Sequence, residues 1–137
     1  MSEPKENAPW VTFRPEIKVL DCTVRDGGLI NAHKFEDNFV KAVYDTCIDS
    51  GIDYMELGYK ASKDQFARAD FGDWKFCDED DIRRIVGENE GPLKLTAMAD
   101  AGKTDYKTDI LPSEQSVLDC IRVATSAHQI PTAVEMI

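Results

Sequence analysis

KVLDCTVRDGGLIN, residues 18–31, decides the fold, because an apolar run breaks here into charged residues and then two glycines. The β-branched stretch Ile17–Val24 predicts a buried strand. Arg25 and Asp26 follow where this strand is expected to end, and the Gly27–Gly28 pair is expected to turn the backbone sharply. The sequence therefore predicts a guanidinium and a carboxylate side by side at the tip of the first strand.

Strand and helix patterns alternate along the rest of the chain, which predicts an α/β fold with a parallel sheet and right-handed crossovers. Apolar residues three and four positions apart predict a helix in Phe35–Gly51. Further strands are predicted at Asp53–Tyr59, Leu93–Asp100 and Cys120–Thr125, and further helical segments at Asp78–Glu88, Ser113–Asp119 and Pro131–Ile137.

The length of the chain limits the architecture. Its 137 residues hold about four βα units, whereas a complete (β/α)₈ TIM barrel needs about 250 residues. We expect a flexible leader at residues 1–15, followed over residues 16–137 by the N-terminal half of an aldolase-type barrel, truncated inside a helical pattern. A small open α/β sheet is the alternative. Unpaired sheet edges of a half barrel predict self-association into a homo-oligomer.

Composition excludes several classes of partner. A formal net charge of −10 disfavours nucleic acid, because such a surface repels phosphate backbones. The four cysteines form no CxxC pair, which indicates reduced thiols in a cytoplasmic protein. No apolar run has the length of a membrane span, so no membrane partner is expected.

Chemistry in parallel α/β folds gathers at the carboxyl ends of the strands. There, Asp26 can bind a hard divalent cation, and Arg25 can hold a substrate carboxylate or stabilise an oxyanion. Asp21, further back, is expected to orient these groups. The alternative is that Arg25 and Asp26 merely pair with each other at a turn.

The stretch LDCTVRDGG resembles the first-strand signature of the DRE-TIM metallolyases, D-x-T-L-R-(D/E)-G. The matching residues are Asp21, Thr23, Arg25, Asp26 and Gly27. MELGY is similar to the second strand of this family, and IRVAT to the fourth strand of its 4-hydroxy-2-oxovalerate aldolases. Hydroxymethylglutaryl-CoA lyase belongs to the same family.

The resemblance implies a metal-dependent aldolase or lyase on a TIM barrel. Asp26 would bind Mg²⁺ or Mn²⁺. Arg25 and Glu56 would be the catalytic residues: Arg25 would stabilise an enolate, and Glu56, near the substrate, would help to orient substrate or proton transfer. The enzyme would cleave or form a carbon–carbon bond beside the carbonyl of a 2-oxo acid or an acyl-CoA. Asn31 and Arg122 are candidate substrate-binding residues, and Asp21, Thr23, Gly27 and Gly28 are candidate structural supports.

Several positions depart from this family. The His-x-His metal pair is absent, since the chain contains only His33 and His128, and Leu29 stands where the aldolases place a catalytic histidine. We expect His33 to be solvated rather than to replace that base. By itself the chain is therefore expected to be nearly inactive.

Two other functions remain open. A Claisen-type, acyl-CoA-dependent synthase of the same superfamily would run the chemistry in the opposite direction. A non-catalytic α/β interaction module would use the aromatic loop that contains Phe66, Phe71, Trp74 and Phe76. That loop is otherwise expected to line the mouth of a pocket, to form a subunit contact or to cover the edge of the barrel.

Overall fold

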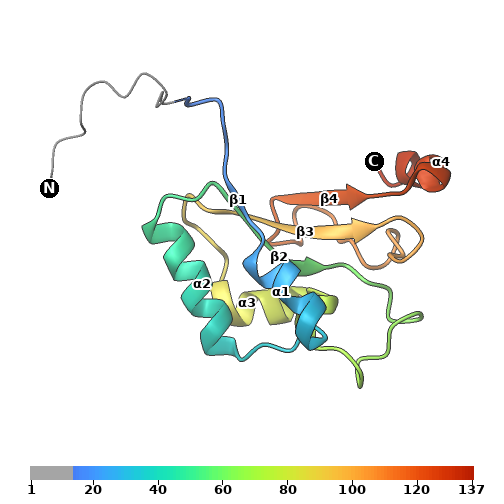
Figure 1. The fold of residues 1–137 in the computed structure, drawn as a ribbon, viewed down its shortest axis with the longest axis horizontal. Helices are drawn as coiled ribbons and strands as arrows, with labels where there is room; N and C mark the ends of the chain where they lie inside the picture. Colours follow the sequence, from blue (N-terminus) through green and yellow to red (C-terminus); the bar gives the residue numbers. More distant parts are fainter. Residues whose placement is uncertain (1–13) are drawn as a thin grey trace, which may run out of the picture.

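The computed structural model describes residues 14–137, in which four strands pair in chain order into one parallel sheet (Figure 1). Each neighbouring pair of strands is parallel. The predicted α/β class is therefore confirmed. The predicted leader lies outside the described residues up to position 13. The strands are β1 (Leu20–Asp21), β2 (Tyr54–Tyr59), β3 (Lys94–Asp100) and β4 (Cys120–Ala124).

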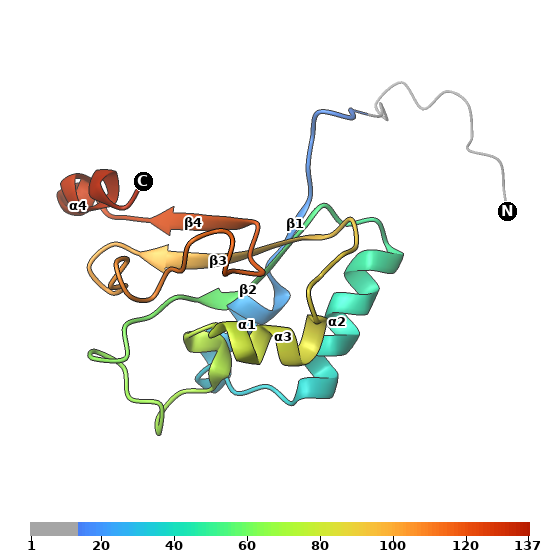
Figure 2. The same ribbon diagram turned by 180° about the vertical axis from the view of Figure 1, so that it is seen from behind.

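The helices lie mainly on one face of the sheet, as the view from behind also shows (Figure 2). They are α1 (Thr23–Asn31), α2 (Asp37–Asp49), α3 (Glu79–Val86) and α4 (Ile130–Glu135), with short 3₁₀ turns η1 (Asp73–Lys75) and η2 (Ala127–Gln129). None of the helices in residues 14–137 is both long and apolar enough to cross a bilayer.

The main core forms where α2 and α3 cover this helix-bearing face. Val40 and Cys47 from α2 and Ile82 from α3 meet Leu57 and Leu95 from the strands, all of them buried. The row of α2 that contains Val40 and Tyr44 faces the core, whereas Phe39 is 43% exposed. The helical periodicity thus predicted the helix correctly.

The opposite face of the sheet carries charged side chains together with Tyr59 and Met98, which belong to a second apolar cluster. Glu56 pairs in register with Thr96, and Arg122 with Met98, and paired residues of neighbouring strands point to the same side. A bulge shifts the register of β2 between Glu56 and Tyr59, so that Tyr59 pairs with Met98. The extra residue brings Tyr59 to the same face as Glu56.

Gly58 lies inside this bulge because no side chain fits there. A Cβ at this position would overlap the carbonyl oxygen of Trp74, in η1, and would lie 2.9 Å from Cys77 Sγ. The backbone of η1 therefore packs directly on β2, and this contact fixes the position of η1 relative to the sheet.

The first strand is shorter than predicted. Only Leu20 and Asp21 form β1, and Ile17 and Val19 are half exposed rather than buried, because β1 is an edge strand that pairs only with β2. The chain then enters α1. The Asp21 carboxylate accepts hydrogen bonds from the backbone N–H (3.1 Å) and the hydroxyl (2.8 Å) of Thr23, which stabilises the start of this helix.

The prediction that Gly27 and Gly28 form a turn is wrong, because both lie inside α1. Gly28 is buried against the ring of His33, and a Cβ on Gly28 would overlap Nδ1 of that ring. Close packing, rather than chain reversal, therefore explains the second glycine.

The connection between β3 and β4 also differs from the prediction. Residues 113–115 form a turn, and no helix lies between the two strands. The buried Glu79 carboxylate holds this connection by accepting hydrogen bonds from the Ser116 hydroxyl (2.6 Å) and the Val117 N–H (2.9 Å). These side-chain hydrogen bonds fix the position of a connection that contains no helix.

Gly28→Ala is expected to lower the free energy of unfolding by about 2 kcal/mol, because the added methyl group must displace a buried imidazole. Gly27→Ala in the same helix is the matched control. Its Cβ would lie 3.3 Å from the partly buried Phe35 ring, and alanine favours a helix over glycine. Urea denaturation followed by circular dichroism measures both. Equal effects of the two substitutions would contradict the packing argument.

Candidate active site

A buried carboxylate between two guanidiniums forms the centre of the site. Glu56, in β2, is completely buried. Its Oε1 accepts a hydrogen bond from Arg25 Nε (2.7 Å), in α1, and its two oxygens accept bonds from Arg122 Nη2 (2.6 Å) and Nε (2.8 Å), in β4. Three predicted site residues from separate elements therefore meet at one point. This point lies on the face of the sheet opposite α2 and α3, which we call the open face.

Charge stabilises this cluster in its ionised form. Burial raises the pKa of Glu56, but hydrogen bonds from Arg122 and Arg25 outweigh burial and leave the pKa below its usual value. Burial likewise lowers the pKa of Arg25, and hydrogen bonds to Glu56 and Tyr59 more than compensate. All three groups are thus charged at neutral pH.

Arg122 is the more accessible of the two arginines. Its side chain is 44% exposed, compared with 14% for Arg25. A guanidinium has five N–H donors, and Glu56 accepts through Nε and Nη2 of Arg122, so Nη1 remains to bind another anion. Such an anion could be a carboxylate that reaches the open face of the sheet.

Asp26 lies in the first turn of α1, where its carboxylate is 59% exposed and pairs with Arg25. Among residues 14–137, no three His, Cys, Asp or Glu side chains are close enough to hold a metal ion together. A single carboxylate that is already paired with an arginine does not make a Mg²⁺ site. The described residues alone therefore do not fit the implied metal.

Asn31 is the last residue of α1, six positions beyond Arg25. Its side-chain amide donates a hydrogen bond to the Lys34 carbonyl (2.6 Å), which closes the loop after the helix. The structure thus does not bring Asn31 into the Arg25–Glu56–Arg122 cluster. A role for it in substrate binding stays a prediction.

His33 is buried, with 2% of its surface exposed, so the prediction of a solvated histidine is wrong. Its ring stands edge-on to Tyr59 at 5.3 Å between centroids, and Nδ1 has no hydrogen-bond partner. Burial, with a smaller effect from the charge of Lys75, lowers the pKa of His33 to about 4. The imidazole is therefore neutral at physiological pH.

Polar residues also line a cavity where β3 and β4 end. Its volume is about 320 Å³, and Asp100, Lys103, Ser126 and Gln129 are among the residues around it. Both strands run toward this end of the sheet, which is where parallel α/β folds bind their ligands. The cavity is large enough for a small molecule.

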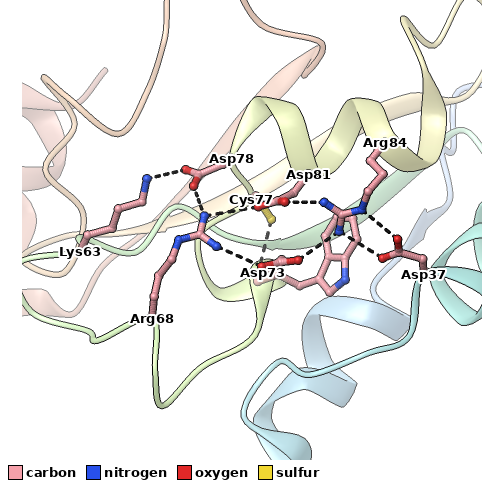
Figure 3. Close-up of polar contacts among 9 residues, drawn as sticks. Asp37, Lys63, Arg68, Asp73, Cys77, Asp78, Asp81 and Arg84 are labelled. Carbon is pink, nitrogen blue, oxygen red and sulfur yellow. Dashed lines mark hydrogen bonds and ion pairs between the residues drawn. The ribbon is translucent and has the colours of Figure 1, made fainter.

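The segment between β2 and α3 is held by a chain of ion pairs, shown in Figure 3. Arg68 pairs with Asp73 (3.0 Å) and with Asp78, and Lys63 also pairs with Asp78 (2.8 Å). Arg84, in α3, joins Asp73 (3.0 Å) to Asp37, in α2 (2.8 Å). Each exposed pair is weak alone, but the network fixes the position of a long connection.

The aromatic residues of that connection take two positions. Trp74 and Phe76 are buried, whereas Phe66 and Phe71 are partly buried and pack beside Tyr59 and Phe76. Phe66 and Phe71 therefore cover the carboxyl end of β2, where Tyr59 lies. Sequence reasoning noted the rings but missed Tyr59, because only the bulge in β2 brings it to the face that carries Glu56.

The comparisons with known proteins give one structural likeness. No protein-family model and no curated protein matches the chain. A solved structure described as the "N-terminal domain of a putative aldolase from Bacteroides vulgatus" matches with a TM-score of 0.74 and 26% sequence identity. The match covers 88% of this chain but 39% of that one, so the chain spans well under half the length of its neighbour. The likeness supports an aldolase-like fold.

Proposed function

We propose that this chain is the N-terminal half of the barrel of an aldolase that cleaves or forms a carbon–carbon bond beside the carbonyl group of a 2-oxo acid. The observation that carries the proposal is the meeting of Arg25, Glu56 and Arg122 on the open face of the sheet. The likeness to a domain of a putative aldolase supports it, as does the DRE-TIM signature in LDCTVRDGG.

The two arginines have different tasks in this proposal. Arg25 is largely buried, and Glu56 fixes its position, so its guanidinium suits stabilisation of negative charge on an enolate oxygen. Arg122 is half exposed and keeps free donors, which suits it to bind the substrate carboxylate. Glu56 orients both arginines and, because it is buried and ionised, is a positioning residue.

The open face of the sheet favours a barrel over an open sheet covered by helices. Glu56 and Arg122 place an ion pair on this face beside Tyr59 and Met98, and a second layer of helices would have to bury that pair. Strand pairing in chain order is also the order in which a (β/α)₈ barrel begins. We therefore retain the half barrel as part of the proposal.

A divalent metal remains part of the proposal only if ligands outside the described residues join Asp26. We expect the 137-residue chain to bind Mg²⁺ weakly, with a Kd above about 1 mM, because Asp26 offers one exposed carboxylate. Isothermal titration calorimetry with MgCl₂ and MnCl₂ measures this. Tight binding that Asp26→Asn abolishes would show that this chain alone completes the site.

Pyruvate binding tests the anion site directly. NMR titration of the ¹⁵N-labelled chain with pyruvate is expected to shift the side-chain Nε signals of Arg25 and Arg122, and Arg122→Met is expected to weaken binding about tenfold. Arg14→Met is the control, because Arg14 is exposed and pairs only with Glu16 among the described residues. Unshifted arginine signals, or an equal effect of both variants, would contradict the proposal.

A further inference from the structure

The cavity at the carboxyl ends of β3 and β4 lies on the same face of the sheet as Arg122. Asp100 in β3 and Ala124 in β4 pair in register, and both line this cavity of about 320 Å³. Ala124 follows Arg122 by two positions in one strand, so the two side chains point to the same face. Both strands run toward α4, as Figure 1 shows. The cavity therefore lies beyond the anion site at Arg122, further along β4.

Gln129 lines this cavity and brings two hydrogen-bond donors to it. Its Oε1 accepts a hydrogen bond from the Ser126 hydroxyl (2.9 Å), which orients the side-chain amide. Among residues 14–137, Nε2 of this amide donates to no other residue. Gly102, with a φ of 80°, leaves the space that the amide needs, because a Cβ there would lie 2.7 Å from Nε2. The amide is therefore held in place while its donors stay unused.

Asp100 and Lys103 are the two charged residues in the lining of the cavity, and their charges are opposite. Lys103 Nζ lies 3.9 Å from the Asp100 carboxylate, which is too far for a hydrogen bond, so both groups keep hydrogen-bonding capacity for a ligand. A second carboxylate or a phosphate group would meet the negative charge of Asp100. A hydroxyl group, in contrast, can donate to Asp100 and accept from Lys103 or Gln129. The lining thus suits neutral hydroxyl groups.

The distance from the anion site sets the length of the ligand. Arg122 lies two residues before Ala124, about 7 Å along the strand, and its guanidinium reaches back to Glu56, which is level with Cys120. The guanidinium and the cavity are therefore on the order of 10 Å apart. A chain of six carbons is about 6 Å long, and a hydrogen bond at each end adds about 3 Å. Such a chain reaches both groups, whereas the three carbons of pyruvate do not.

We propose that this cavity binds the hydroxyl groups of a 2-oxo acid whose chain has about five or six carbons, that is, a sugar-derived acid. This inference rests on the proposed function, because it takes the carboxylate of the substrate to lie at Arg122. It narrows the class of substrate. The carbons far from the carboxylate carry hydroxyl groups, to which Gln129 and Lys103 donate and from which Asp100 accepts.

Gluconate and hexanoate are the matched probes for this inference. Both are carboxylates of six carbons, but only gluconate carries further hydroxyl groups, and neither has the reacting carbonyl group. In NMR titrations of the ¹⁵N-labelled 137-residue chain, gluconate is expected to bind at least about tenfold more tightly than hexanoate, because only gluconate makes hydrogen bonds in the cavity. Equal affinities, or tighter binding of hexanoate, would overturn the inference.

Gln129→Leu locates the binding of the hydroxyl groups. Leucine has a similar size and no donors, so gluconate should bind about tenfold more weakly, while the affinity for hexanoate stays the same. Gln115→Leu is the control, because Gln115 is exposed and lies outside the lining of the cavity. Circular dichroism checks that both variants fold. Weaker gluconate binding in both variants, or in neither, overturns the inference.

The probes also separate this inference from the proposed function. If pyruvate shifts the arginine Nε signals while gluconate binds no more tightly than hexanoate, the anion site is supported and the hydroxyl-binding cavity is overturned. If gluconate binds more tightly and shifts the side-chain amide signals of Gln129, but neither gluconate nor pyruvate shifts the arginine signals, the cavity is supported and the anion site is contradicted. The two failures are therefore distinguishable in one preparation of protein.

Discussion

Glu56→Gln is expected to lower the free energy of unfolding by about 3 kcal/mol at pH 7. The substitution leaves Arg25 and Arg122 near each other and removes the buried negative charge that both contact. Loss of one partner from a buried ion pair typically costs 3–5 kcal/mol. We expect the low end of that range, because Arg122 is 44% exposed and can turn toward water.

Two further variants show whether this loss of stability comes from the buried ion pairs. Glu114→Gln is the control, because Glu114 is exposed and hydrogen-bonds only its neighbour Ser113 among the described residues. Adding Arg122→Met to Glu56→Gln should restore part of the lost stability, since it removes the repulsion between the two guanidiniums. Urea denaturation followed by circular dichroism gives all three values. A loss below about 1 kcal/mol for Glu56→Gln would mean that the ion pairs contribute little to folding.

Stability is expected to fall by about 3 kcal/mol between pH 6.5 and pH 4 because of His33 alone. The pKa of His33 is lowered from 6.5 to about 4 in the folded protein. Between these values the unfolded chain binds a proton that the folded chain does not, so acid favours unfolding. The contribution is fully present above pH 6.5 and is lost as the pH falls toward 4, at about 1.4 kcal/mol per unit.

His33→Asn isolates this effect, because asparagine does not titrate. It also tolerates the positive φ of 60° at this position. Its absolute stability will differ for packing reasons, so the comparison is between slopes of unfolding free energy against pH. Glu56 also loses its stabilising charge in acid, since its pKa lies below its usual value, but it does so in both proteins. Parallel slopes for the wild type and the variant would contradict the assignment to His33.

The regular elements could be predicted from the sequence because burial patterns determine them. The predicted strands Asp53–Tyr59, Leu93–Asp100 and Cys120–Thr125 agree with β2, β3 and β4 to within one residue. Helix α1 could not be predicted, because two glycines and β-branched residues disfavour a helix. It forms because Asp21 stabilises its start and His33 packs against Gly28.

The candidate site was only partly visible in the sequence. Arg25, Glu56 and Arg122 stood out individually, since charged residues rarely occupy strands without a partner. That Arg122 binds Glu56 depends on the alignment of β2 and β4 across β3, which no local pattern encodes.

The bulge at Gly58 has a consequence for how related sequences can diverge. Deleting one residue between Glu56 and Tyr59 would restore regular alternation and leave the tyrosine on the face of Glu56, opposite Met98 as before. Inserting one residue would shift η1 against β2, where there is no room. Homologues can therefore lose the bulge and keep the tyrosine on this face, but they cannot lengthen this part of β2 without moving η1.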